Sequence, residues 1–231
     1  MNQRMSPERY KKIRQVLAFR QPDLTVCMEE VHKPHNVSAV IRSCEAVGVA
    51  GVHAVWRQND SLRNNIAMGS QVWVKTHKHE SIVDAVGFFK QQKMQVLVTH
   101  LDDSAVDFRQ VDYTKPTALI LGQEKLGATA QAVQLADQAV IIPMVGMVQS
   151  LNVSVAAAIL MYEAQRQRQQ AGMYDHQRLD EAECQRVLFE GGFPALYKEC
   201  IRRKLPLPYI NDEGSIEAEK SWWQALQFSE L

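Results

Sequence analysis

The chain has 231 residues, of which 46% are hydrophobic and 23% are charged, with 26 basic side chains against 26 acidic ones. This composition excludes an intrinsically disordered chain. No apolar run approaches the roughly 20 residues that a membrane-spanning helix needs, and no apolar segment follows the basic N-terminus as it does in a secretory signal. We therefore expect a cytoplasmic protein with one compact domain and short terminal additions.

The cysteine and histidine residues give no sign of a metal or redox site. The four cysteines lie far apart and form no C-x-x-C pair, which favours four reduced thiols. Two histidine pairs stand out, His32 with His35 and His77 with His79, but neither has a third ligand at usable spacing. No metal is expected.

The charge is unevenly distributed along the chain. Residues 1–20 carry six basic side chains against one acidic one, which gives a net charge of +5. A second basic cluster, residues 198–204, precedes a tail, residues 205–231, in which five acidic side chains accompany one lysine. Such basic clusters fit either a polyanion-binding edge or two solvated helix faces.

The predicted elements begin with a basic N-terminal helix within residues 1–21, which Ser6 can cap and for which Pro7 suits the first position. Short apolar strands then alternate with helices. The expected strands are 24–29, 52–56, 95–101, 117–122 and 138–144, with a candidate around 73–76, and the expected helices are 36–48, 81–94, 128–136 and 150–170. This alternation predicts an α/β core over residues 22–170, with a parallel sheet covered on both faces. Residues 171–231 form a helical C-terminal extension with proline-punctuated loops.

Ligands of open α/β sheets bind at the carboxyl ends of the strands, so the loops there are the candidates for a site. No G-x-G-x-x-G or G-x-S-x-G motif follows a strand, which argues against a dinucleotide fold and excludes an α/β-hydrolase. The loop from Gly122 to Gly127 has the glycine spacing of a P-loop. However, Ala128 occupies the place of the phosphate-binding lysine, and Glu124 would repel a polyphosphate.

Three stretches remain as candidates for a functional site: N-x-x-x-x-x-R at 36–42, L-G-x-E-x-x-G at 121–127, and I-P-M followed by S-L-N-V-S at 142–154. Asn36 is expected to cap a helix, and Arg42 either forms a surface ion pair or contacts a buried anion. Ser150 is expected to cap the last core helix, an interpretation that leaves Asn152 and Ser154 without a role.

The order and spacing of these stretches resemble the three motifs of the SpoU/TrmH family of SPOUT-class RNA methyltransferases, and among its members those that modify tRNA. Similarity covers essentially the whole chain, including the runs TVCMEEVHKPHNVSA and YEAQRQRQQAGMY. The resemblance implies a SPOUT fold, in which the C-terminal part of a parallel sheet forms a deep trefoil knot, and a homodimer. It also implies that S-adenosyl-L-methionine binds to backbone around four positions, namely Thr99, Gly122, Ile142 and Leu151.

The implied reaction is 2′-O-methylation of the ribose of guanosine 18 in the D-loop of tRNA, and a 2′-hydroxyl nucleophile selects RNA over DNA. The family assigns activation of this hydroxyl to the arginine that matches Arg42, with Asn36, Glu124, Ser150 and Asn152 holding the geometry. A guanidinium has no acceptor lone pair. Two hypotheses therefore stand: either a desolvated Arg42 is the base, or Arg42 fixes a phosphate or ribose oxygen while another acceptor takes the proton.

The basic clusters then become candidates for tRNA phosphate contacts. The residues concerned are Arg9, Lys11, Lys12, Arg202, Arg203 and Lys204. Two alternatives remain, a ribosomal RNA methyltransferase of the same family and a non-catalytic RNA-binding protein on the same fold. Against the first, only about 20 residues precede the core, which is too few for the separate RNA-binding domain that ribosomal relatives often carry.

Overall fold

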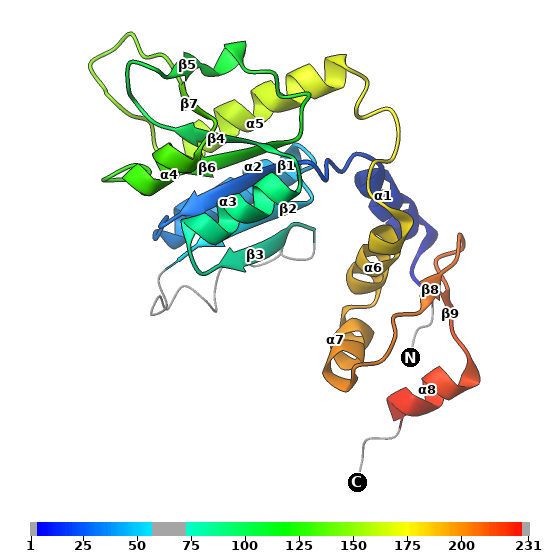
Figure 1. Cartoon of the computed structure of the whole chain (residues 1–231). Helices are drawn as coiled ribbons and strands as arrows, with labels where there is room; N and C mark the ends of the chain where they lie inside the picture. Colours follow the sequence, from blue (N-terminus) through cyan, green and yellow to red (C-terminus); the bar gives the residue numbers. More distant parts are fainter. Residues whose placement is uncertain (1–3, 57–72, 228–231) are drawn as a thin grey trace. The chain divides into compact units, whose positions relative to one another are not determined.

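The computed structural model describes residues 4–56 and 73–227. The chain forms two compact units: a larger one of residues 21–175, and a smaller one that combines the residues up to 20 with those from 176 onwards (Figure 1). Among the described residues, no helix has both the length and the apolar character required to cross a membrane.

The larger unit is built on a sheet of seven strands in the order β3-β2-β1-β6-β4-β7-β5, and all its pairs are parallel. The strands are β1 (Leu24–Glu29), β2 (Gly51–Val55), β3 (Lys75–His79), β4 (Gln95–Thr99), β5 (Val106–Asp107), β6 (Thr117–Leu121) and β7 (Gln138–Ile141). A short 3-10 helix, η2 (Phe108–Gln110), follows β5. The prediction of a parallel sheet is confirmed. Because its strands are parallel, the loops that leave their carboxyl ends share one edge.

Helices cover both faces of this sheet, as predicted. Val37 and Ile41 of α2 (Pro34–Ala46) and Leu160 of α5 (Val153–Gln170) belong to one hydrophobic cluster, which also contains Val26 of β1. On the other face, Cys27 shares a second cluster with residues of α3 (Ile82–Gln91) and α4 (Ala130–Leu135). Successive residues of β1 thus point to opposite faces, because side chains alternate along a strand.

Two helix starts differ from the prediction, and both differences affect the site. Helix α2 begins at Pro34 with Lys33 as its N-cap, so Asn36 does not cap it and the prediction that it does is wrong. Proline suits the first position of a helix because an N–H group there would have no acceptor within the helix, so its loss removes no hydrogen bond. Helix α5 begins at Val153 and not at Ser150, and its N-cap is Asn152, whose side chain accepts from the Ser154 backbone nitrogen at 2.8 Å.

A buried arginine fixes the far end of α5. Arg168 is fully buried, and its Nη1 donates to the Asp23 carboxylate at 2.6 Å. Its Nε donates to the Tyr113 carbonyl at 2.9 Å, and its Nη2 to the Lys115 carbonyl at 3.0 Å. A buried charge is tolerated when it is paired and hydrogen-bonded in this way. Since Asp23 and Lys115 precede β1 and β6, α5 ends at the amino edge of the sheet and begins at the carboxyl edge.

The smaller unit consists of α1 (Pro7–Ala18), α6 (Glu181–Gly192), α7 (Pro194–Arg203), α8 (Lys220–Gln227) and a hairpin of β8 (Tyr209–Ile210) and β9 (Ile216–Glu217). Ser6 caps α1, as predicted, by accepting from the Arg9 backbone nitrogen at 3.2 Å. The two hairpin strands pair only with each other, so no described part of the C-terminal extension adds a strand to the seven-stranded sheet.

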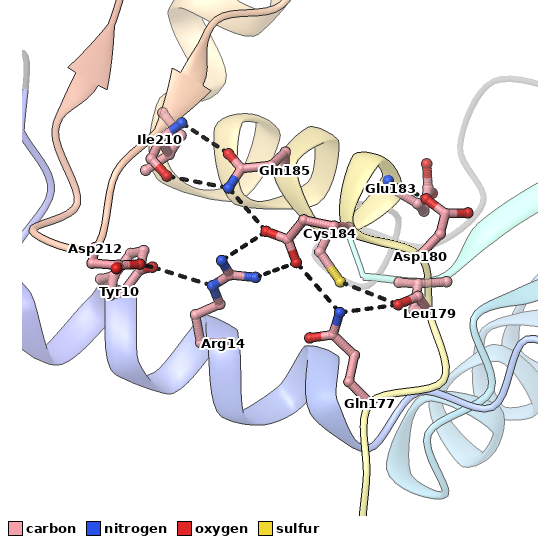
Figure 2. Close-up of polar contacts among 11 residues, drawn as sticks. Tyr10, Arg14, Gln177, Leu179, Asp180, Glu183, Cys184, Gln185, Ile210 and Asp212 are labelled. Carbon is pink, nitrogen blue, oxygen red and sulfur yellow. Dashed lines mark hydrogen bonds and ion pairs between the residues drawn. The ribbon is translucent and has the colours of Figure 1, made fainter.

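A polar network joins the two ends of the chain within this unit (Figure 2). Arg14 of α1 donates twice to the Glu181 carboxylate of α6, at 2.7 and 2.9 Å. The pKa of Glu181 is consequently lowered to about 2. Gln185 extends the network to the hairpin, because its Oε1 accepts from the Ile210 nitrogen at 2.8 Å. The N-terminal helix is therefore part of a structure completed by the C-terminal segment.

All four cysteines are free and buried, as expected from their spacing. Burial raises the pKa of each thiol, to about 12 for Cys44 and to about 11 for Cys184, where Glu181 contributes further. Thiols held neutral in this way are poor nucleophiles and poor metal ligands.

Candidate active site

The loop that follows β6, residues 122–129, closes tightly on itself, and we call it the glycine loop. Gln123 and Gly127 exchange two backbone hydrogen bonds, at 2.9 and 3.1 Å. A Cβ on Gly122 would lie 2.0 Å from the Ala128 nitrogen, and Gly127 has a φ of +70°, in the region that favours glycine. Both glycines are therefore required by the backbone, and the loop holds Glu124 near its tip.

The three stretches singled out in the sequence meet at this loop. Asn36, buried in the first turn of α2, donates from Nδ2 to the Glu124 carboxylate. Its Oδ1 accepts from the Asn152 Nδ2 at 3.2 Å. The Asn152 Oδ1 in turn accepts from the Ser154 hydroxyl at 2.6 Å. Asn36 thus joins partners that lie 88 and 116 residues away in the sequence.

This network corrects the role assigned to the start of α5. The capping interpretation left Asn152 and Ser154 without a role, but Asn152 caps the helix and joins it to α2, and Ser154 donates to Asn152. Ser150 is exposed and makes no hydrogen bond with any described residue. The expectation that Ser150 caps α5 is therefore wrong.

Arg42 lies outside the network. It sits six residues after Asn36 on α2, about 9 Å along the helix axis at 1.5 Å per residue. Its side chain is exposed, and within the described residues it has no hydrogen-bond or ion-pair partner. The surface ion pair expected as one interpretation is therefore not formed with any described residue, and the contact with an anion stays a prediction. Its five N–H donors are free to bind an external anion.

The four residues expected to contact a cofactor lie in two groups at the carboxyl edge. Thr99 ends β4 and Gly122 follows β6, and these strands are neighbours in the sheet. Ile142 follows β7, which pairs with β4, and Leu151 directly precedes the N-cap of α5. The structure therefore gathers these four positions around the strands β6, β4 and β7.

The segment between Ile142 and Leu151, residues 143–150, contrasts with the glycine loop, and we call it the open segment. No hydrogen bond joins it to any other described residue. Three of its large apolar side chains are exposed, with relative exposures of 108% for Val145, 99% for Met147 and 62% for Val148. Leu126 of the glycine loop adds a fourth at 79%. Exposed apolar side chains next to free backbone donors and acceptors are typical of a surface that binds a ligand or another protein.

One buried contact escaped the sequence analysis. Glu29, the last residue of β1, is only 2% exposed, and its carboxylate accepts from the Thr129 nitrogen at 2.9 Å and from the Thr129 hydroxyl at 2.7 Å. Thr129 is the N-cap of α4 and the last residue of the glycine loop. The available signal was a carboxylate at the end of a strand, LTVCME, that is otherwise apolar except for Thr25.

The six residues predicted to contact RNA all lie in the smaller unit, and they differ in whether their side chains already have partners. Lys11, Lys12 and Lys204 are exposed. The arginines already have partners: Arg9 donates to the Gly191 carbonyl, and Arg202 and Arg203 both pair with Glu199. These two arginines lower the pKa of Glu199 to about 2. We therefore expect the lysines to be the more available cations for a polyanion.

The histidines on β3 belong to a packed cluster. The Nδ1 of His53, on β2, lies 2.7 Å from the Nε2 of His79, and the His53 ring stacks on His77. Burial and these two neighbours lower the pKa of His53 to about 3. Within the described ranges, no group of three or more histidine, cysteine or acidic residues is arranged to hold a metal ion.

Comparisons with known proteins cover most of the chain. The model of the SpoU rRNA Methylase family matches residues 23–162, and the model of the SpoU rRNA methylase C-terminal region matches residues 166–219. The tRNA (guanosine(18)-2′-O)-methyltransferase of Escherichia coli K12 is 58% identical over 227 residues, which cover 96% of this chain and 99% of that protein.

Solved structures show the same architecture. The crystal structure of the Aquifex aeolicus TrmH/SpoU tRNA modifying enzyme superposes with a TM-score of 0.75 at 42% identity, over 81% of this chain and 96% of that one. The SpoU methyltransferase AviRb from Streptomyces viridochromogenes, solved in complex with the cofactor AdoMet, gives a TM-score of 0.55 at 28% identity. That match covers 64% of this chain and 59% of AviRb.

Proposed function

Because the chain belongs to the SpoU rRNA methylase family, we propose that it transfers a methyl group from S-adenosyl-L-methionine (AdoMet) to the ribose 2′-hydroxyl of guanosine 18 in the D-loop of tRNA. The observation that carries this proposal is the network of Glu124, Asn36 and Asn152, which unites the three family motifs at one edge of the sheet. The family name refers to ribosomal RNA, but the Escherichia coli relative, matched over nearly its whole length, is named for tRNA.

The carboxyl edge of the sheet fits AdoMet. This cofactor has an apolar adenine face, which suits the exposed side chains of Val145, Met147 and Leu126, and polar edges, which suit the unpaired backbone of the open segment. Thr99, Gly122, Ile142 and Leu151 would hold it through backbone groups. The cofactor supplies an electrophilic methyl group on a sulfonium. This chain's residues would bind it, exclude water and bring the ribose hydroxyl into line with it.

Arg42 would bind the RNA. Its exposed guanidinium has no partner among the described residues and only donors to offer. It can therefore bind a phosphate through two parallel hydrogen bonds, or donate to a ribose oxygen. In this proposal another acceptor takes the hydroxyl proton. Asn36, Glu124 and Asn152 would keep the glycine loop and the start of α5 in fixed register, and Ser150 would meet the substrate directly.

The tRNA would be held mainly by Lys11, Lys12 and Lys204 of the smaller unit, with Arg9, Arg202 and Arg203 contributing less because they already have partners. Phosphate contacts of this kind position a folded RNA without reading its sequence. They give no reason to expect DNA as a substrate, since DNA lacks the hydroxyl that is methylated.

We further propose that the protein is a homodimer with a trefoil knot and acts in the cytoplasm, where tRNA is modified. The apolar side chains of the open segment support the dimer, because a second chain would cover those that the cofactor leaves exposed. The knot is proposed from the family resemblance, since the family model matches residues 23–162.

The decisive experiment is methyl incorporation from labelled AdoMet into an unmodified tRNA transcript, with the nucleotide mapped by mass spectrometry. We expect a ribose methyl group on the D-loop guanosine, and none with Arg42→Ala. Strong activity of Arg42→Lys would contradict the bidentate role, because lysine keeps the charge but not the planar fork. Tight tRNA binding without incorporation would favour the non-catalytic protein, and incorporation into ribosomal RNA alone would favour the other methyltransferase.

A further inference from the structure

We propose that Glu29 is a positioning residue that anchors the glycine loop in its binding conformation, and thereby sets the affinity for AdoMet. The inference deepens the proposed function and rests on it for the identity of the ligand. It is carried by the two hydrogen bonds that the buried Glu29 carboxylate accepts from Thr129.

The contact is stronger than an ordinary capping interaction. Burying a carboxylate is unfavourable unless donors satisfy it, and Glu29 has no lysine or arginine partner among the described residues. Its two donors, a backbone N–H and a hydroxyl, both belong to Thr129. Hydrogen bonds to an ionised acceptor are about twice as strong as neutral ones. Thr129 is therefore held where the carboxylate is, at the end of β1.

The glycine loop is thus fixed from both faces of the sheet. Glu29 lies two residues after Cys27 on β1, and residues two apart on a strand point to the same face. Glu29 is therefore on the face covered by α3 and α4. Asn36, which holds Glu124 near the loop tip, belongs to α2 on the opposite face. Between these anchors the loop contains two glycines, the residues that restrict a backbone least. Without Glu29, one end of the loop loses its fixed point.

The contact is not needed to start α4. The Thr129 hydroxyl already caps that helix by accepting from the Ala132 nitrogen at 3.1 Å. Ser81 caps α3 in the same way, accepting from the Asp84 nitrogen at 3.1 Å, but its hydroxyl donates to the exposed carboxylate of Asp84 and not to a buried one. This comparison provides a control, because Ser81→Ala removes a helix cap that is remote from the glycine loop.

The test uses Glu29→Gln in the full-length protein. Glutamine keeps the side-chain volume but turns one acceptor into an NH₂ group that faces donors. In the protein without cofactor, we expect the backbone amides of Gln123, Gly127 and Thr129 to exchange hydrogen several times faster. If the loop then keeps its binding conformation in about a tenth of the molecules, the Kd for AdoMet, measured by calorimetry, rises about tenfold.

Two further variants separate positioning from general stability. Thr129→Ser keeps both donors and should bind AdoMet like the wild type. Thr129→Val loses the hydroxyl donor and should resemble Glu29→Gln. It serves as the test variant if Glu29→Gln does not fold. Ser81→Ala should lower the Tm and leave the Kd unchanged.

The proposal is overturned if Glu29→Gln lowers the Tm while amide exchange in residues 122–129 and the Kd stay as in the wild type. If the wild type binds no AdoMet, the proposed function fails, and the exchange measurement still decides whether Glu29 anchors the loop.

Discussion

Two loops at the same edge of the sheet are built in opposite ways. The glycine loop closes through paired backbone groups and is held by Glu29 and Asn36. The open segment has no hydrogen bond to any described residue and exposes Val145 and Met147 almost completely. The difference indicates that the chain itself fixes one half of the candidate site, whereas the other half is completed by what binds to it.

This division has an energetic reason. A loop that is ordered before binding loses little conformational entropy when the ligand arrives, so more of the interaction energy appears as affinity. When a ligand or a second chain covers apolar side chains that were exposed to water, the free energy of the complex is lowered. The glycine loop thus provides a preformed binding conformation, and burial of the open segment provides favourable free energy of binding.

The largest effect should follow from Gly122→Ala in the glycine loop. The added methyl would lie 2.0 Å from a backbone nitrogen, so the loop must open, at a cost of about 3 kcal/mol in the free energy of unfolding. Methyl transfer should be lost. Urea unfolding and the incorporation assay measure the two effects. The matched control is Gly146→Ala in the open segment, where a Cβ meets nothing within 4 Å. Equal destabilisation by both changes would abolish the contrast between the loops.

A pH change should weaken the sheet through a group in neither loop. Burial and its histidine neighbours lower the pKa of His53 to about 3, whereas an unfolded histidine titrates near 6.5. Below about pH 6.5 the unfolded chain binds a proton at this histidine that the folded chain does not bind, so stability is full above that pH and falls as the pH is lowered toward 3. At pH 5 the loss in the free energy of unfolding is about 2 kcal/mol. Thermal unfolding of wild type and His53→Phe over this range measures it. A pH dependence that survives in His53→Phe would assign the effect to His77, His79 or another group.

The junction between the two loops should show coupling of intermediate size. Asn152→Ala removes the cap of α5 and the contact with Asn36, at a cost of about 1 to 2 kcal/mol. In a double-mutant cycle with Asn36→Ala, we expect a coupling energy of about 1 kcal/mol, because each change removes the same hydrogen bond. Additive effects would mean that the amides act separately.

The smallest effect on stability should come from the open segment. Val145→Ser combined with Met147→Ser should change the free energy of unfolding of the ligand-free monomer by less than about 0.5 kcal/mol, since both side chains are exposed. The same variant should bind AdoMet more weakly or associate less with itself, as calorimetry and sedimentation can measure. A large loss of monomer stability would show that the segment packs against its own chain.

The sequence predicted the scaffold better than the contacts within the site. Periodicity predicted both covered faces and every strand of the sheet except β5, because burial determines where apolar side chains recur. Strand β5 was missed because two residues are too few to show a period. The role of Asn36 was predicted wrongly, because Pro34 starts the helix earlier and frees the amide for Glu124. The contact between Glu29 and Thr129 spans 100 residues, and no local pattern could relate them. Arg42 was identified by its motif alone, since its side chain has no partner among the described residues.

The network that joins the chain ends has a consequence for synthesis. Arg14 leaves the ribosome early, but its partner Glu181 is made 167 residues later, and Asp212, which accepts from Tyr10, is made 202 residues after that tyrosine. At translation speeds of about 5 to 20 residues per second, the first helix therefore waits roughly 10 to 30 seconds for its partner. During that time α1, whose Ile13 and Leu17 are buried in the finished protein, lacks α6, a helix that it contacts. A truncated product would keep this helix unpaired permanently, so the smaller unit forms only in chains whose synthesis has reached the C-terminal segment.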